Sequence, residues 1–208
     1  MATTKVEPAR ALRADAERNR RRILDAARAV FAEHGLGVGV DAVAREAGVG
    51  VGTLYRRFPT KQDLLRAIVE DRVEQLVARL EAAAAVDDPW DSFAAAAEAF
   101  AGAIARDRAF FEVVQAVEPG TAHAKRQRTL KAIAPILRRA QKEGVVRDDL
   151  VIEDFPAICA IAARLPAWRL EQQPDLWRRY LGVVLDGVRP EAAHPLPHPR
   201  PRRPKPPA

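Results

Sequence analysis

The chain has 208 residues, 48% of them apolar, and a net charge of +6, so it is long enough to bury a substantial core. No apolar run approaches the roughly 20 residues that a membrane-spanning helix needs, and the N-terminal segment lacks the apolar stretch of a secretory signal. These features, with a single cysteine that excludes an intrachain disulfide, predict a cytoplasmic protein without a membrane partner.

The positive charge is concentrated at the two ends of the chain. Residues 1–65 hold 12 Lys and Arg against 8 Asp and Glu, a net charge of +4, and residues 189–208 also carry +4. Residues 66–188 carry a net charge of −2. This asymmetry indicates an anionic partner for the N-terminal part, and nucleic acid is the commonest such partner.

The chain opens with a basic arm and a first helix. Residues 1–15 lack apolar periodicity, which predicts a flexible arm. From Ala16 onward apolar residues return at helical spacing, and His34 and Gly35 supply a stop signal. A helix is therefore expected over residues 16–34.

Two short helices follow a glycine-rich connection. Asp41 is a suitable N-cap for a helix over residues 42–47, and Gly48 is placed to end that helix in a left-handed conformation. The second short helix is expected over residues 50–58, after which Thr60 can cap the next one. Two short helices around a turn with glycine are typical of a helix-turn-helix.

From residue 61 on, the sequence predicts only helices. The remaining helices are expected near residues 61–84, 89–104, 110–117, 121–143, 152–168 and 174–188. The sequence therefore predicts an all-α protein of about nine helices. A small N-terminal domain over residues 16–60 is joined by the long helix to a larger domain over residues 61–188, and a disordered tail rich in Pro and Arg follows over residues 189–208.

The glycines of residues 48–52 also raise the possibility of a loop that binds a nucleotide cofactor. The dinucleotide pattern Gly-x-Gly-x-x-Gly fails because its last position is Thr53 or Tyr55, and the P-loop pattern fails at Thr53. No cofactor site is therefore predicted. On a helix-turn-helix, the same segment presents hydroxyl, small and cationic side chains that can contact phosphates and base edges: Val51, Gly52, Thr53, Tyr55, Arg56 and Arg57.

The segment GVDAVAREAGVGVGTLYRRFPTKQDLL resembles the DNA-binding domain of the tetracycline-repressor (TetR) family of bacterial regulators. The resemblance runs from about residue 20 to residue 65 and includes the opening helix RILDAARAVFAEHG. It implies DNA contacts by Gly52, Thr53, Tyr55, Arg57 and Lys61, with Val51 near base edges or a thymine methyl group and Arg56 as a phosphate or guanine contact. Phosphate contacts are also expected from the arginines of the first helix: Arg18, Arg20, Arg21 and Arg22.

The resemblance implies a dimeric repressor that a small-molecule effector releases from a palindromic operator in double-stranded DNA. The sequence departs from the family where Gly50 replaces a Ser or Thr cap and Val51 replaces a polar or basic reader. These departures support an alternative, a helical small-molecule-binding protein with little sequence-specific DNA binding. Neither a catalytic constellation nor a metal-ligand set stands out, so the sequence predicts no enzyme.

The resemblance also implies that the last two helices form a four-helix bundle with those of a second copy. The candidate residues of this dimer interface are Ile158, Leu165, Trp177, Tyr180, Leu181 and Val184. Ligand pockets are commonly apolar with few polar anchors, and the candidate pocket residues are Phe93, Phe100, Phe110, Phe111, Arg164 and Trp168. Core packing is the alternative for the aromatic residues, and an exposed position is the alternative for Arg164.

Overall fold

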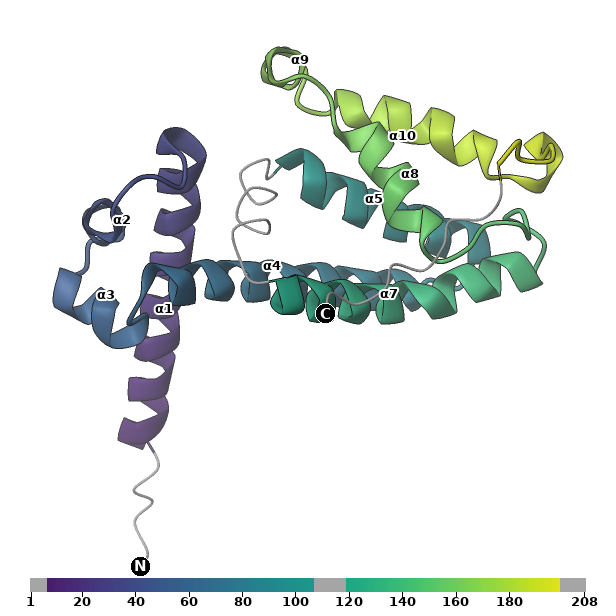
Figure 1. The fold of residues 1–208 in the computed structure, drawn as a ribbon. Helices are drawn as coiled ribbons and strands as arrows, with labels where there is room; N and C mark the ends of the chain where they lie inside the picture. Colours follow the sequence, from purple (N-terminus) through teal and green to yellow (C-terminus); the bar gives the residue numbers. More distant parts are fainter. Residues whose placement is uncertain (1–6, 107–118, 199–208) are drawn as a thin grey trace, which may run out of the picture.

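The computed structural model describes residues 7–106 and 119–198, which form nine α-helices and one short 3-10 helix (Figure 1). The helices are α1 (Glu7–His34), α2 (Val40–Glu46), α3 (Val51–Arg57), α4 (Lys61–Ala84), α5 (Pro89–Arg106), α7 (Pro119–Lys142), α8 (Asp154–Ala163), α9 (Ala167–Gln172), α10 (Leu176–Gly187) and the 3-10 helix η1 (Pro190–Ala192). The all-α prediction is confirmed. The helix expected over residues 110–117 lies outside the described residues.

Two hydrophobic cores lie along α4. The first joins α1, α2 and α3 to the first part of α4, up to Val77, and the second joins the last part of α4, from Leu80, to α5, α7, α8 and α10. Figure 1 shows α1, α2 and α3 grouped around one end of α4 and the other helices around its remaining length. The long helix thus contributes side chains to both cores.

Helix α1 begins at Glu7, earlier than the start at residue 16 that apolar spacing indicates. Its first turns are rich in Ala, Arg and Glu, which favour helix without providing an apolar stripe. Pro8 lies in the first turn, where its missing N–H costs no helical hydrogen bond. Periodicity detects only the part of this helix that packs against the core.

The ends of the short helices follow the glycines. Gly48 has φ +62°, so the prediction that it ends α2 in a left-handed conformation is confirmed. The prediction that Asp41 caps α2 was wrong, because Gly39 is the N-cap and Asp41 lies within the first turn. The carboxylate of Asp41 still favours the helix there, since the N-terminus carries partial positive charge.

Helix α4 begins with a capping box at Thr60 and Asp63. The Thr60 hydroxyl oxygen accepts a hydrogen bond from the Asp63 N–H, and the Asp63 carboxylate accepts one from the Thr60 N–H, both at 3.1 Å. Hydrogen bonding by the Thr60 side chain lowers the pKa of the Asp63 carboxyl below its usual value. This reciprocal cap fixes the point at which the chain leaves the helix-turn-helix.

The helix expected over residues 152–168 is divided in two. Helix α8 ends at Ala163 and α9 begins at Ala167, with Pro166 as the N-cap of α9. Proline has no N–H to donate and disfavours a helical conformation at the residue before it, which accounts for the break. Cys159 of α8 is fully buried, and burial raises the pKa of its thiol to about 12.

The first residues after α10 are fastened to the rest of the chain. Arg147, which is 8% exposed, pairs with Asp149 through two hydrogen bonds of 2.6 and 2.8 Å. Its guanidinium also donates to the carbonyl oxygen of His194 at 2.7 Å. The Arg189 guanidinium lies 3.6 Å from the centre of the Trp90 ring. Residues 189–194, which the sequence assigns to the disordered tail, are thus held against α5 and the segment after α7.

Candidate nucleic-acid interface

Helix α3 is anchored by its buried residues and by the turn before it. Leu54 is 0% exposed and Phe58 is 5% exposed, and both belong to the first core. Gly50 is the N-cap without a side-chain hydrogen bond, as the sequence indicates, and its carbonyl oxygen accepts from the Thr53 N–H at 2.8 Å. These contacts fix one side of a seven-residue helix and leave the other side open.

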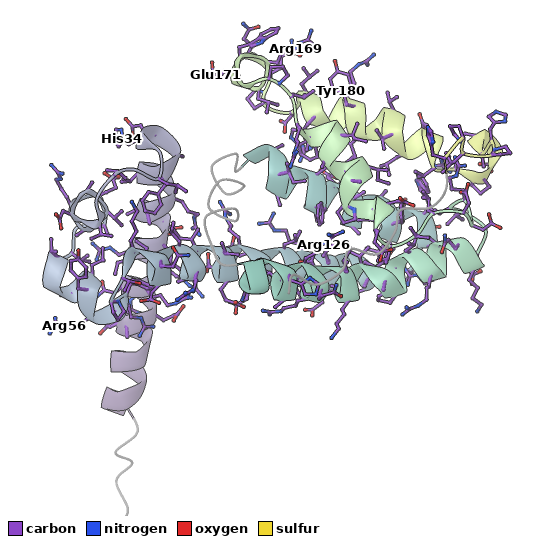
Figure 2. The ribbon with its side chains drawn as sticks, in the orientation of Figure 1. His34, Arg56, Arg126, Arg169, Glu171 and Tyr180 are labelled. Atoms are coloured by element: carbon purple, nitrogen blue, oxygen red, sulfur yellow. The ribbon has the colours of Figure 1, made fainter. Side chains whose placement is uncertain are left out.

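The open side of α3 carries the side chains that the sequence assigns to DNA contact. Val51 is 40% exposed and Tyr55 is 45% exposed, although both side chains are hydrophobic. The Arg56 guanidinium donates to the Thr53 hydroxyl oxygen at 3.1 Å, and Figure 2 shows Arg56 at the outer edge of α3. The predicted contact residues that share this helix are Val51, Gly52, Thr53, Tyr55, Arg56 and Arg57.

The arginines of α1 differ in where they point. The side chains of Arg18 and Arg21 are 67% and 73% exposed. The Arg20 side chain is only 20% exposed and lies 3.9 Å from the Asp71 carboxylate of α4. Arg20 therefore faces α4, whereas the sequence assigns it to DNA because of its charge.

Lys61, at the first position of α4, also points into the protein. Its ammonium group donates to the carbonyl oxygens of Leu36 and Val38, the latter at 2.7 Å. It also lies 5.6 Å from the centre of the Phe31 ring, a cation–π distance. The side chain that the sequence assigns to a phosphate thus secures the connection between α1 and α2 in this structure.

Two carboxylates on α4, which the sequence did not reveal as functional, hold neighbouring helices. Asp71 accepts a hydrogen bond of 2.7 Å from Arg28 of α1. Glu70 pairs with Lys125 and, at 2.7 Å, with Arg128, both of α7. Polar residues beside an apolar stripe are the only sequence signal, and that signal does not reveal their partners.

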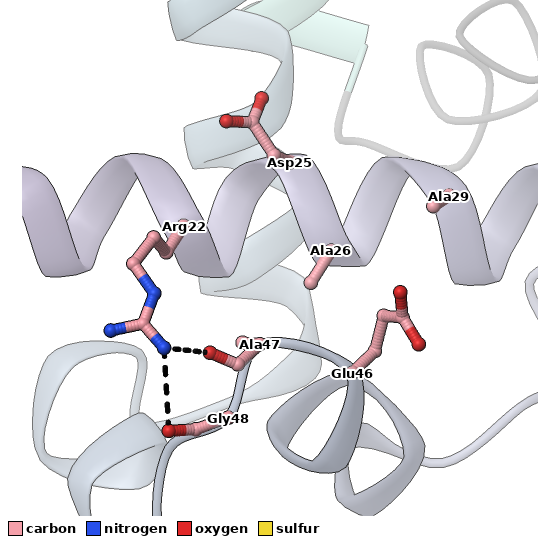
Figure 3. Close-up of a pocket in the computed structure, with 7 residues that line it drawn as sticks. All are labelled: Arg22, Asp25, Ala26, Ala29, Glu46, Ala47 and Gly48. Carbon is pink, nitrogen blue, oxygen red and sulfur yellow. Dashed lines mark hydrogen bonds between the residues drawn. The ribbon is translucent and has the colours of Figure 1, made fainter.

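A cleft of about 410 Å³ lies between α1 and the end of α2 (Figure 3). Its lining is mainly small or charged: Arg22, Asp25, Ala26, Ala29, Glu46, Ala47 and Gly48. The Arg22 guanidinium crosses the cleft to the carbonyl oxygens of Ala47 and Gly48. This cleft belongs to the helix-turn-helix region and contains none of the predicted pocket residues.

The predicted pocket residues fall into two groups. Phe93 and Phe100 both stand edge-on to Phe155, with ring centres 5.4 and 6.0 Å away, inside the second core. Arg164 is exposed at the end of α8, and Trp168 is 56% exposed on α9. Two of these side chains thus pack in the second core, whereas the other two are exposed. Phe110 and Phe111 lie outside the described residues.

The predicted dimer residues are also divided. Trp177 and Leu181 are 1% and 4% exposed and belong to the second core of the chain itself. Within the chain, the apolar stripe of α10 packs against α5 and α8. The other four predicted residues are half-buried: Ile158, Leu165, Tyr180 and Val184. The most exposed apolar side chains of α8 and α10 are Ile161 and Val183, at 71% and 64%.

Residues 23–68 match the family described as bacterial regulatory proteins, tetR family, and residues 88–190 match the SbtR-like C-terminal domain of transcriptional regulators. The crystal structure of a TetR transcription regulatory protein from Mycobacterium vanbaalenii is 32% identical to this chain. That match covers 86% of this chain and 99% of the other, with a TM-score of 0.66.

Two further proteins are similar over different lengths. The transcriptional regulator FadR from Bacillus subtilis, solved in complex with stearoyl-CoA, shares the fold at 21% identity and a TM-score of 0.65, over 84% of this chain and 99% of that one. A curated HTH-type transcriptional regulator from Staphylococcus aureus (strain USA300) is 40% identical over 60 residues. Those residues make up 28% of this chain and 32% of the length of that relative.

Proposed function

Because this chain belongs to the TetR family of bacterial transcriptional regulators, we propose that it is a dimeric repressor that binds a palindromic operator and is released by a small molecule. Members of this family are regulators rather than enzymes. The observation that supports DNA binding most strongly is the open side of α3, where Val51 and Tyr55 are exposed beside Arg56 and Arg57. A protein with this task acts in the cytoplasm, where the DNA lies. Within the described residues, no helix has the length and apolar character required to cross a membrane.

In this proposal α3 enters the major groove of the operator. The hydroxyl groups of Thr53 and Tyr55 and the guanidinium of Arg57 contact phosphates, which fix the position of the helix but carry no base specificity. Val51 lies against base edges and contacts a thymine methyl group, and Arg56 contacts a guanine or a phosphate. Lys61 contributes its charge at the start of α4, where backbone N–H groups also attract a phosphate.

The dimer is proposed to form through the outer faces of α8 and α10. Ile161 and Val183 are the exposed apolar side chains on these helices, since the stripe containing Trp177 is buried within the chain. A two-fold arrangement places two copies of α3 about 34 Å apart, or at a multiple of that spacing, to match two operator half-sites.

The effector is proposed to bind in the C-terminal domain and to favour a state with a different spacing of the two α3 helices. The aromatic cluster of Phe93, Phe100 and Phe155 offers apolar contacts there. FadR from Bacillus subtilis, which has the same fold, was solved with stearoyl-CoA. Effectors with an apolar portion are therefore the first class to test, and release requires a higher affinity for the state that does not bind DNA.

An electrophoretic shift assay with the DNA that flanks the gene of this protein tests the proposal. We expect the wild-type protein to shift one fragment, and we expect Tyr55→Phe combined with Arg57→Ala to weaken binding to all sequences, since both side chains are exposed on α3. Arg126→Ala is a suitable control, because Arg126 is exposed on α7, away from α3 (Figure 2). Undiminished affinity in the double variant would contradict the proposal.

The second candidate is a helical small-molecule-binding protein with little sequence-specific DNA binding. The uncapped start of α3 at Gly50 and the apolar Val51 beside it favour this candidate. In the same assay it predicts equal, weak binding to every fragment. A preferred fragment whose identity changes in a Val51 variant would exclude it.

A further inference from the structure

The turn between α2 and α3 determines how α3 is presented, and part of its backbone is not satisfied by the turn itself. The N–H groups of residues 47, 48 and 49 donate back to the carbonyl oxygens of Val43, Arg45 and Ala44, at 2.9, 3.1 and 3.0 Å. These bonds close the last turn of α2. No backbone N–H of this turn donates to the carbonyl oxygens of Ala47 and Gly48, which leaves both open to side-chain donors.

Arg22 of α1 supplies these donors. Its Nη2 atom lies 2.7 Å from the carbonyl oxygen of Ala47 and 3.5 Å from that of Gly48 (Figure 3). A guanidinium suits the end of a helix, because the C-terminus carries partial negative charge. The contact joins α1 to a turn 25 residues later in the chain.

The turn and the guanidinium fit each other closely at Gly48. This residue has φ +62°, which disfavours any side chain, and a Cβ atom built there would lie 3.0 Å from Nη2 of Arg22. The same position thus permits both the left-handed turn and the approach of Arg22.

The neighbouring arginines on α1 make different contacts. Arg18 and Arg21 pair with Asp15 and Glu17 of their own helix and remain largely exposed. Arg20 faces Asp71 of α4. Arg22 is the member of this run that the structure joins to the turn before α3.

We propose that Arg22 is a positioning residue that sets the orientation of α3 by binding the carbonyl groups of the turn, and that it contacts no DNA phosphate. This inference rests on the proposed DNA binding by α3. It assigns Arg22 a role different from the phosphate contact that its charge and its place in the run of arginines indicate.

A positioning role and a phosphate contact predict different effects of Arg22 substitution on the salt dependence of DNA binding. Loss of a phosphate contact lowers the slope of log affinity against log salt concentration by about 0.9, and it weakens binding to all sequences alike. Loss of a positioning contact misplaces the base-reading face of α3. Affinity for the operator then falls, while the slope and the affinity for unrelated DNA stay as in the wild type.

The test uses the full-length protein with the variants Arg22→Met, Arg22→Lys and, as a matched control, Arg21→Met. We expect Arg22→Met to lower operator affinity about tenfold without a change of slope, since one directional contact is lost. Arg22→Lys restores part of the affinity, because an ammonium group can still donate to one carbonyl. Arg21→Met leaves the ratio of operator to unrelated DNA affinity unchanged. A slope lowered by about 0.9 in Arg22→Met, or unchanged operator affinity, would overturn the proposal.

Amide hydrogen exchange of residues 47–51 in the free protein supplies a readout that does not depend on DNA. We expect faster exchange in Arg22→Met than in wild type or Arg21→Met. Equal exchange rates in the three proteins would contradict the contact itself. If the wild type binds no DNA at all, the proposed function fails, whereas this measurement still decides whether Arg22 holds the turn.

Discussion

Several basic side chains of this protein bind backbone carbonyl groups. The Lys61 ammonium group donates to Val38 at 2.7 Å, the Arg139 guanidinium to Val86 at 2.6 Å, and the Arg147 guanidinium to His194 at 2.7 Å. Each of these contacts secures a segment that leaves or enters a helix. The net positive charge of the chain therefore overstates the number of cations that are free to meet DNA.

Lys61 offers a test at the scale of one residue. In Lys61→Met the carbonyl oxygens of Leu36 and Val38 lose their donor, so we expect the free energy of unfolding to fall by about 1–2 kcal/mol. Urea denaturation measures this loss. Arg126→Met, an exposed position on α7, is the control and should change stability by less than about 0.5 kcal/mol. Equal stability of the two variants would mean that Lys61 does not secure the connection between α1 and α2.

At the scale of elements, two adjacent carboxylates join α4 to two different neighbouring helices. Asp71 holds α1 through Arg28 and lies near Arg20, and Glu70 holds α7 through Lys125 and Arg128. A rotation of α4 about its axis would strain both sets of contacts together. These ion pairs therefore keep the helix-turn-helix in register with the C-terminal helices.

Removal of the Asp71 charge should weaken the contact between α1 and α4. In Asp71→Asn, Arg20 and Arg28 lose a partner whose side chain is 15% exposed, and we expect a loss of about 1–2 kcal/mol in unfolding free energy, less than for a fully buried pair. Glu74→Gln removes the same charge from an exposed position on α4 and serves as control in thermal denaturation. Similar melting temperatures for both variants would contradict a structural role of Asp71.

The outer face of α8 and α10 makes a separate prediction about assembly. Ile161→Asp combined with Val183→Asp places charges on the proposed interface, so we expect a monomer in light scattering with helical content unchanged. Leu196→Asp is the control, because this side chain is 51% exposed but lies beyond these helices. It should leave the mass of the dimer in light scattering unchanged. A dimeric double variant would exclude this face as the interface.

Features determined by neighbouring residues could be predicted from the sequence. Gly48 ends α2 through its own backbone conformation, and Thr60 caps α4 by bonding to a residue three positions later. Both effects depend only on residues that are close in the sequence. The partners of Arg20 and Trp177 could not be predicted, since they depend on which helix faces which. Trp177 lies on a stripe that suits either a core or an interface, and only the packing of α10 against α5 and α8 decides between them.

At the scale of the whole molecule, one long helix connects a DNA-reading unit to a larger helical unit. Both cores contain residues of α4, so a change in the packing of the second core can alter the position of α1, α2 and α3. This arrangement gives the proposed effector a physical route to α3. Control by the effector also requires that the protein has two conformational states that differ in affinity for the effector.

In the proposed complex, two copies of α3 read two half-sites of one operator. Hydroxyl-radical footprinting tests it most directly, with wild type and a Tyr55→Phe, Arg57→Ala double variant compared at equal protein concentration. We expect wild type to protect two symmetric segments about one helical turn of DNA apart, or a multiple of that distance, and the double variant to protect neither. A single unsymmetric protected segment, or full protection by the double variant, would contradict the claim.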